Sequence, residues 1–162
     1  MSSADHNLSA FQGSDVPSGK DMRFGIVVSE WSLEVTKALL NGALNTLLKH
    51  DVKEDHILIK WVPGSYELPL AAQLIAENEK VNAVICLGCV IQGETRHFDF
   101  ICNAVSQGIM NLNLDYNMPF IFGVLTPNDQ QQALERAGGK YGNKGDEAAI
   151  TALKMAALQK TI

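Results

Sequence analysis

Four short hydrophobic runs stand out along the chain and predict the strands of a sheet. The central run, residues 83–91 (AVICLGCVI), is apolar without alternation and rich in β-branched residues. Such a run is typical of a strand buried on both faces, as in the middle of a parallel sheet. Three further strands are predicted at residues 23–29, 57–62 and 120–125.

Between these runs, apolar residues recur at helical spacing. Leucines at positions 33, 40, 44 and 47 predict one face of a helix that ends near His50, with Ser32 as its N-cap. A second helix follows the central strand, because apolar residues recur at Phe98, Ile101, Cys102, Val105 and Ile109. Further helices are expected from about Tyr66, with Pro69 in the first turn, and over residues 129–137 and 146–159.

Strands and helices alternate, which predicts an α/β fold with a parallel sheet and helices on both faces. We expect a flavodoxin-like three-layer sandwich with a four-stranded sheet. Residues 21–162 form one domain in this interpretation. Residues 1–20 are rich in Ser, Asp and Gly and lack periodicity, which predicts a flexible arm from which Phe11 and Val16 could pack.

Length and charge narrow the class of protein. The chain has 162 residues, so it can bury roughly 70% of its unfolded surface without a disulfide or metal. A formal charge of −5 argues against nucleic acid and anionic membranes as partners. No apolar run approaches the roughly 20 residues of a membrane span, and the first residues do not resemble a signal peptide. We therefore expect a cytoplasmic protein.

The pair Cys86 and Cys89 forms a C-x-x-C, a spacing that can indicate a zinc or redox site. On a strand, however, positions three apart point to opposite faces. We therefore expect these two cysteines and Cys102 to be reduced and structural. No metal-ligand spacing occurs elsewhere, and no metal is expected.

The loops after the four strands should open at one edge of the sheet, where α/β proteins bind ligands. Trp31, in the first loop, could stack on a planar heterocycle, although from pattern alone a core tryptophan is favoured. In the second loop, Gly64 allows a ligand to approach the N–H groups of Ser65 and Tyr66. Glu67 could accept hydrogen bonds from hydroxyls, or it could simply stabilise the positive end of a helix.

The third loop carries the strongest chemical signal. Gly93, Glu94 and Thr95 precede a helix whose first free N–H groups favour an anion. His97 stands in the first turn of that helix, and imidazole is suited to proton transfer near neutral pH. A titratable group beside an anion site predicts a reaction centre.

Arg136 and Lys144 flank a glycine-rich loop, residues 138–145. The loop could cradle a phosphate, but it does not match the P-loop motif and does not follow a strand. From pattern alone, a helix–helix turn with solvated cations is the favoured interpretation. The residues taken by themselves thus predict a site for an anionic, planar ligand.

Four strings of the sequence together resemble lumazine synthase: PGSYELP, GCVIQGETRHFDFICN, PFIFGVLT and ERAGGKYGNKGDEAA. The likeness runs from about residue 23 to residue 158. It implies condensation of 5-amino-6-ribitylamino-pyrimidinedione with 3,4-dihydroxy-2-butanone 4-phosphate to 6,7-dimethyl-8-ribityllumazine, the penultimate step of riboflavin biosynthesis. It also implies that neither a metal nor an organic cofactor takes part.

The resemblance also implies roles for single residues. Trp31 would stack on the pyrimidinedione ring, and His97 would move protons during imine formation and phosphate loss. The polar edge and ribityl chain would be bound by Ser32, Gly64, Ser65, Tyr66 and Glu67, with backbone contacts from Val90 and Ile91. The butanone phosphate would be held by Gly93, Glu94, Thr95 and Arg136, and a neighbouring subunit would offer Phe122 and Lys144. The chain departs from the family's usual residues at Trp31, Ser65, Tyr66 and Gln92.

Family members assemble as pentamers with sites between neighbours, and some build an icosahedral shell of twelve pentamers. The short form of residues 138–145 favours the shell, and the segment before the first strand is expected to extend a neighbour's sheet. Riboflavin synthase is a candidate partner.

Two other functions compete with this one. A non-catalytic riboflavin- or lumazine-binding protein would not need Thr95, His97 and Arg136, and a flavodoxin-like regulatory domain would need an acidic cluster or a flavin-phosphate loop after the first strand. A Schiff base on Lys144 is unnecessary, because the substrate already carries the nucleophile.

Overall fold

A computed structural model describes residues 7, 9 and 16–162 of the chain, and its centre is a four-stranded sheet. All neighbouring strands of this sheet run parallel, in the order β2-β1-β3-β4. The strands are β1 (Phe24–Ser29), β2 (Ile57–Val62), β3 (Ala83–Cys89) and β4 (Phe120–Leu125). The predicted α/β class and four-stranded parallel sheet are confirmed.

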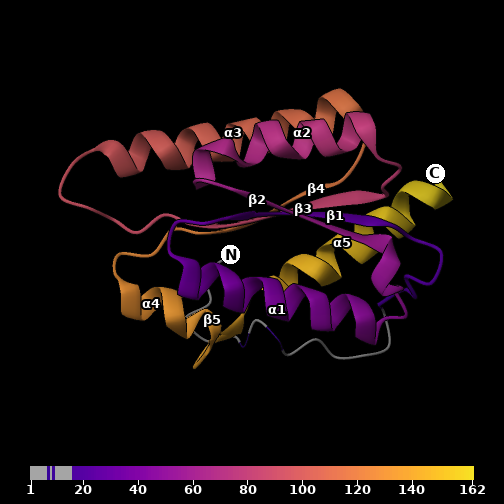
Figure 1. The fold of residues 1–162 in the computed structure, drawn as a ribbon, viewed down its shortest axis with the longest axis horizontal. Coiled ribbons are helices and arrows are strands. Elements are labelled where there is room, and N and C mark those ends of the chain that lie inside the picture. Colours follow the sequence, from indigo (N-terminus) through magenta and orange to yellow (C-terminus); the bar gives the residue numbers. More distant parts are fainter. Residues whose placement is uncertain (1–6, 8, 10–15) are drawn as a thin grey trace.

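Helices cover both faces of the sheet (Figure 1). One layer contains α2 (Leu68–Asn78) and α3 (His97–Tyr116), and the other contains α1 (Leu33–Lys49) and α5 (Lys144–Thr161). The short α4 (Gln130–Glu135) lies on the α1 side. The predicted three-layer sandwich is therefore confirmed.

The sheet separates two hydrophobic cores, as the two-residue period of a strand requires. Ile26 and Val28 of β1 pack with the α1–α5 layer, whereas Val27 between them packs with the α2–α3 layer. Every residue of β3 is buried, as predicted for a central strand. Its two cysteines divide in the same way, because Cys86 belongs to the α2–α3 core and Cys89 to the α1–α5 core.

The cysteines are all free, which confirms the structural interpretation of the C-x-x-C. Burial raises the pKa of the Cys86 thiol to about 12. Burial also raises the pKa of Cys89 to about 11, although a hydrogen bond with Ser32 acts in the opposite direction. Both thiols are consequently neutral near pH 7 and behave as small apolar groups.

The starts of α2 and α1 differ from the prediction. The helix expected from Tyr66 begins as a 3₁₀ turn, η3 (Ser65–Glu67), and α2 starts at Leu68. Ser32 does occupy the N-cap position of α1, but its φ of 58° is left-handed and its side chain makes no capping hydrogen bond. Leu33 is 44% exposed and lies off the buried face, where Val35 and Leu39 pack instead.

The glycine-rich loop is more structured than the predicted turn. It contains a small antiparallel hairpin of β5 (Ala137–Gly139) and β6 (Gly142–Asn143). Gly138 (φ 109°) and Gly142 (φ 84°) adopt backbone angles that favour glycine. The hairpin closes the loop, so the Lys144 N–H donates to the Arg136 carbonyl oxygen at 2.8 Å. The last helix therefore begins at Lys144, two residues earlier than predicted.

The described part of the N-terminal segment contacts its own chain. Val16 packs against the α1–α5 core, and the Gly19 N–H donates to the His50 carbonyl oxygen at 2.7 Å. Phe11 and most of the predicted arm lie outside the described residues, and the extension of a neighbour's sheet stays a prediction. None of the helices that the structure describes is long and apolar enough to cross a membrane.

Candidate active site

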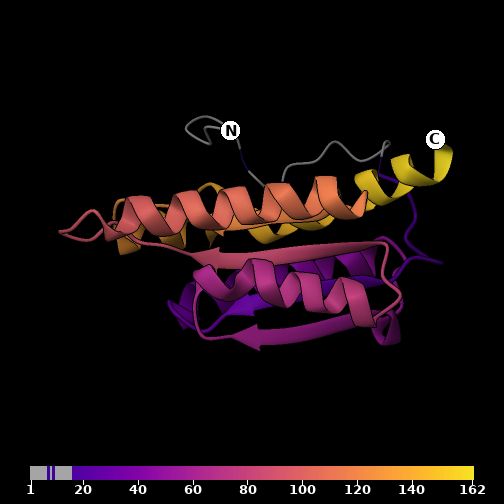
Figure 2. The same ribbon diagram turned by 90° about the horizontal axis from the view of Figure 1, so that it is seen from above.

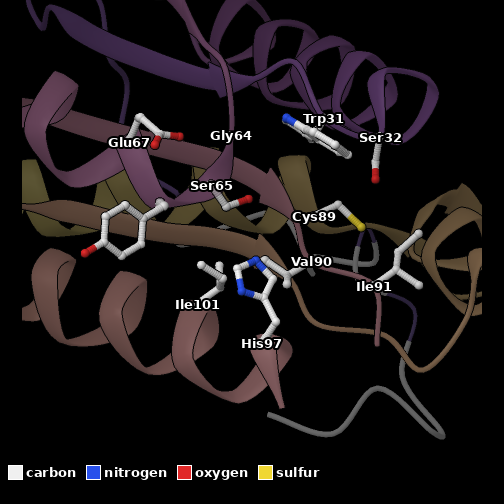
Figure 3. Close-up of a pocket in the computed structure, with 11 residues that line it drawn as sticks. Trp31, Ser32, Gly64, Ser65, Glu67, Cys89, Val90, Ile91, His97 and Ile101 are labelled. Atoms are coloured by element: carbon white, nitrogen blue, oxygen red, sulfur yellow. The ribbon is translucent and has the colours of Figure 1, made fainter. Parts of the chain in front are cut away.

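A pocket of about 740 Å³ opens at the carboxyl edge of the sheet (Figure 3). The predicted loops supply most of its wall. The lining residues are Trp31, Ser32, Gly64, Ser65, Tyr66, Glu67, Cys89, Val90, Ile91, His97 and Ile101.

Backbone hydrogen bonds fix the loop after β1 against the end of β2. The Glu30 N–H donates to the Val62 carbonyl oxygen at 2.8 Å, and the Trp31 N–H donates to the Pro63 carbonyl oxygen at 3.2 Å. These bonds hold the Trp31 indole beside the pocket, where it is 73% exposed. The alternative of a core tryptophan is therefore wrong, and the ring offers a broad apolar face for stacking.

Gly64 gives the indole and a carboxylate room to approach the same point. A Cβ atom at Gly64 would lie 3.5 Å from Trp31 Cδ1 and 3.0 Å from Glu67 Oε2. Within the following η3 turn, the Tyr66 side chain is 59% exposed, whereas Ser65 is buried. The turn thus combines an exposed aromatic ring, a carboxylate and a buried hydroxyl on one wall of the pocket.

The segment after β3 continues to pair with the segment after β4. The Val90 N–H donates to the Leu125 carbonyl oxygen at 2.8 Å, and the Gln92 N–H donates to the Pro127 carbonyl oxygen at 3.0 Å. Beyond Gln92 the chain projects past the edge of the sheet before α3 begins (Figures 1 and 2). Gly93, Glu94 and Thr95 lie on this projection, are exposed and do not line the pocket.

His97 is the first residue of α3, in the first turn as predicted. The backbone N–H of His97 donates to Thr95 Oγ1 at 3.4 Å, and Arg96 Nε pairs with Asp99 Oδ2 at 3.8 Å in the same turn. The imidazole is exposed and stands on the opposite side of the pocket from Trp31 (Figure 3). One chain therefore brings the proposed stacking group and the proposed proton-transfer group to one cavity.

Arg136 does not line this pocket. It is half-buried at the end of α4, where its guanidinium lies 4.8 Å from the centre of the Tyr141 ring and donates to the Gln132 carbonyl oxygen at 3.1 Å. Figure 1 shows α4 and the projection before α3 at the same end of the molecule.

Phe122 and Lys144 lie in a different cleft, of about 450 Å³, between β4, α3 and α5. Phe122 is 38% exposed, and Lys144 Nζ pairs with Glu147 Oε1 at 2.9 Å. One group of the predicted site residues therefore lines the pocket around His97, and Phe122 and Lys144 lie in a second cleft. Gly93, Glu94, Thr95 and Arg136 line neither cavity.

Two residues of the pocket were not predicted from the sequence. Ile101 stands one helical turn after His97, and Cys89 is the last residue of β3, directly before Val90. Both positions could have been found, because the i, i+4 spacing places Ile101 beside His97 and the end of a central strand reaches the carboxyl edge. Apolar character alone, however, predicts a place in the core for both residues.

The fold and the pocket together define a small α/β protein of flavodoxin-like architecture, with a ligand-sized pocket at the carboxyl edge of a parallel sheet. The sequence profile of 6,7-dimethyl-8-ribityllumazine synthase matches residues 21–160. The chain belongs to the lumazine synthase family.

Proteins that bear this enzyme name align with nearly the whole chain. A 6,7-dimethyl-8-ribityllumazine synthase from Cytophaga hutchinsonii is 60% identical over 157 residues, which is 97% of this chain and 98% of that protein. Those of Parabacteroides distasonis and Porphyromonas gingivalis are each 54% identical, over 96% and 99% of this chain and 97% and 99% of their own length. The resemblance found in the four sequence strings is confirmed.

Proposed function

We propose that the pocket between Trp31 and His97 is where this chain joins 5-amino-6-ribitylamino-pyrimidinedione to 3,4-dihydroxy-2-butanone 4-phosphate. The products are 6,7-dimethyl-8-ribityllumazine, phosphate and water, in the penultimate step of riboflavin biosynthesis. The observation that carries the proposal is the meeting of Trp31 and His97 across one pocket of a chain that belongs to this family.

The pyrimidinedione ring stacks on the exposed indole of Trp31, with Val90 and Ile91 offering backbone groups at its edge. Ser32 and the Gly64–Glu67 turn bind the polar groups and the ribityl chain. This assignment is supported by the position of all these residues on the same pocket wall. An aromatic face and a few placed polar groups are what a small-molecule site requires.

His97 moves protons in the condensation. The amine of the pyrimidinedione attacks the ketone, the resulting carbinolamine loses water to give an imine, and phosphate then leaves. The resulting enol becomes a ketone, and attack of the ribitylamino nitrogen on it with loss of a second water closes the ring. Loss of water needs a proton on the departing oxygen, and loss of phosphate needs a proton removed from carbon. An exposed imidazole on the wall of the pocket can serve both steps, and fixing the two substrates side by side supplies much of the remaining acceleration.

The butanone phosphate is held at the outer end of the pocket by Gly93, Glu94 and Thr95, with Arg136. The projecting segment lies directly before the N-terminus of α3, a helix of 20 residues whose positive end favours an anion. Arg136 follows α4 at the same end of the molecule, which supports its part in this subsite although it is off the pocket wall.

Phe122 and Lys144 act in the site of a neighbouring subunit. Their position in a separate cleft supports this, because they are not on the wall around their own His97.

Large apolar side chains on α2 and α3 are also exposed and would be covered by a neighbour, namely Leu70, Leu74, Phe100, Met110 and Leu114. We propose a cytoplasmic homo-pentamer, with twelve pentamers in an icosahedral shell, and riboflavin synthase as the partner that uses the product.

The His97→Ala variant tests the catalytic assignment. We expect turnover to fall by roughly 10- to 1,000-fold, the contribution of one acid–base group to a condensation that proceeds slowly unaided. The assay mixes both substrates and follows the absorbance of the lumazine product. His50→Ala, at the far end of α1, is the matched control and should keep normal turnover. Full turnover in a folded His97→Ala protein would refute the role, and an inactive wild type would refute the function.

A further inference from the structure

Two buried serine hydroxyls, one of them on the pocket wall, have no hydrogen-bond partner in the described part of the chain. Ser29, the last residue of β1, is fully buried, and Ser65 in η3 is 5% exposed. Neither Oγ atom has a partner among the residues that the structure describes. Buried hydroxyls are nearly always paired, because leaving one unpaired forfeits the hydrogen bonds it made to water. A pair of such exceptions beside a ligand pocket calls for a physical explanation.

Both hydroxyls face Gly88 of β3. A Cβ atom on Gly88 would lie 2.6 Å from Ser65 Oγ and 3.4 Å from Ser29 Oγ. Ser29 is beside this glycine because β1 and β3 pair in parallel, with Val28 opposite Leu87. Because Gly88 has no side chain, both oxygens lie within 3.4 Å of one point, and no hydrogen bond joins them in this structure.

The surroundings of this pair are apolar on the side of the helices. Leu68 Cδ1 lies 3.0 Å from the same Cβ position, so an apolar side chain closes that side. Figure 3 shows the Ser65 side chain pointing from its turn toward Cys89, inside the ring of pocket residues. Because a serine O–H rotates about its Cβ–Oγ bond, Ser65 can present its hydrogen or a lone pair to the pocket while its oxygen stays beside Gly88.

We propose that Ser65 and Ser29 are positioning residues for the heterocyclic substrate. In the occupied site, Ser65 Oγ bonds to a neutral polar group of the ligand, and Ser29 Oγ supplies the second hydrogen bond to Ser65. A hydroxyl can donate one bond and accept two, so Ser65 can serve both partners. The inference rests on the proposed function and assigns to Ser29 a part that neither the sequence nor the pocket lining indicates.

The ligand group is neutral and belongs to the pyrimidinedione, as a ring carbonyl, a ring N–H or a chain hydroxyl. The phosphate substrate is the poorer match, because an anion favours cations and free helix N–H groups over two neutral hydroxyls beside apolar side chains. A site built to pair with such a group also discriminates against analogues that lack it.

Calorimetric titration of the pyrimidinedione alone, without the second substrate, tests the pair. We expect Ser65→Ala to weaken binding by about 3- to 10-fold, the effect of one neutral hydrogen bond. Ser29→Ala should weaken it less, and the double variant should match Ser65→Ala because Ser29 acts through Ser65. The melting temperature of the free protein should stay equal or rise, since each change removes an unpaired hydroxyl. Ser18→Ala, whose hydroxyl donates to Asp51 at 2.8 Å away from the pocket, is the matched control.

A ring analogue without the ribityl chain locates the partner group. If Ser65→Ala binds this analogue more weakly than the wild type does, the group that bonds to Ser65 is on the ring. If Ser65→Ala loses affinity only for the full ligand, that group is on the ribityl chain. Unchanged affinity for both ligands would overturn the inference, as would a parallel loss of affinity and free-protein stability. A wild type that does not bind the pyrimidinedione would refute the proposed function as well, whereas normal binding by both wild type and Ser65→Ala would refute only the role of the serines.

Discussion

Trp31 is held at the pocket by its backbone rather than by packing of its side chain. Its N–H is fixed to Pro63 while its ring is 73% exposed, so much of the indole surface contributes nothing to folding. Stacking against a planar ligand would bury that surface, and aromatic contacts add to the gain from burial alone. The Trp31 ring can therefore contribute to ligand binding while contributing little to the stability of the fold.

Arg136 gives the residue-scale prediction. A charge-assisted contact to phosphate is worth roughly 1.5–3 kcal/mol, so Arg136→Ala should weaken binding of the butanone phosphate by about 10- to 150-fold. The affinity for the pyrimidinedione should change much less. Titrating each substrate separately measures the two affinities and tests this prediction.

Lys140 offers a matched control for this experiment, because its Nζ lies 5.1 Å from the centre of the same Tyr141 ring. Lys140→Ala should leave both affinities near normal. If Arg136→Ala weakened both substrates equally, the arginine would be a structural residue that supports the hairpin through Tyr141.

Single residues also show where prediction from sequence ends. Trp31, Ser65 and His97 could be placed at one edge because parallel strands all end there. Ser29 could not be singled out, because whether a hydroxyl finds a partner depends on neighbours that only the folded chain brings together. The alternatives of an exposed or a core Trp31 could not be separated for the same reason.

At the scale of elements, the start of α5 is fixed against α1. Asn143 Oδ1 accepts from the Gly145 N–H at 2.8 Å, while Asn143 Nδ2 donates to the Ala38 carbonyl oxygen at 2.9 Å. The two helices approach closely here, since a Cβ on Gly145 would lie 1.9 Å from the Leu39 carbonyl oxygen. The side chain of any other residue at position 145 would force the helices apart.

Gly145→Ala should therefore lower the free energy of unfolding by at least about 2 kcal/mol, near the upper end of the usual cost of over-packing. Urea unfolding measures the change. Gly93→Ala is the matched control for stability, because no atom lies within 4 Å of its Cβ position, and it should change the free energy by less than about 0.5 kcal/mol. Equal stability of the two variants would contradict the close packing of α1 and α5.

Elements with strong hydrophobic patterns were predicted with their boundaries, as β2 and β4 show. The β5–β6 hairpin was missed because strands of two and three residues, mostly glycine, carry no periodicity. The η3 turn was missed for a related reason, since a 3₁₀ turn of three residues is too short to show a periodicity of its own. Local geometry of this kind is decided by packing rather than by pattern.

At the scale of the whole molecule, the exposed apolar side chains of α2 and α3 favour assembly. The short hairpin between α4 and α5 leaves the outer surface without an insertion that would obstruct contacts between pentamers. We therefore expect light scattering at neutral pH to show a shell of twelve pentamers. A dominant particle with the mass of five subunits, in both phosphate and Tris buffers, would refute the shell and leave the pentamer.

The two cysteines of β3 have a consequence for how opening of the fold can be followed. Alkylating reagents react with the thiolate, a form that burial suppresses at both residues. Modification of Cys86 therefore has to wait until the α2–α3 layer detaches, whereas Cys89 also lines the pocket and can be reached from it. The rate at Cys86 thus reports local opening of the α2–α3 layer, and the rate at Cys89 reports access through the pocket. A single strand carries one chemical probe for the opening of a layer and one for the pocket.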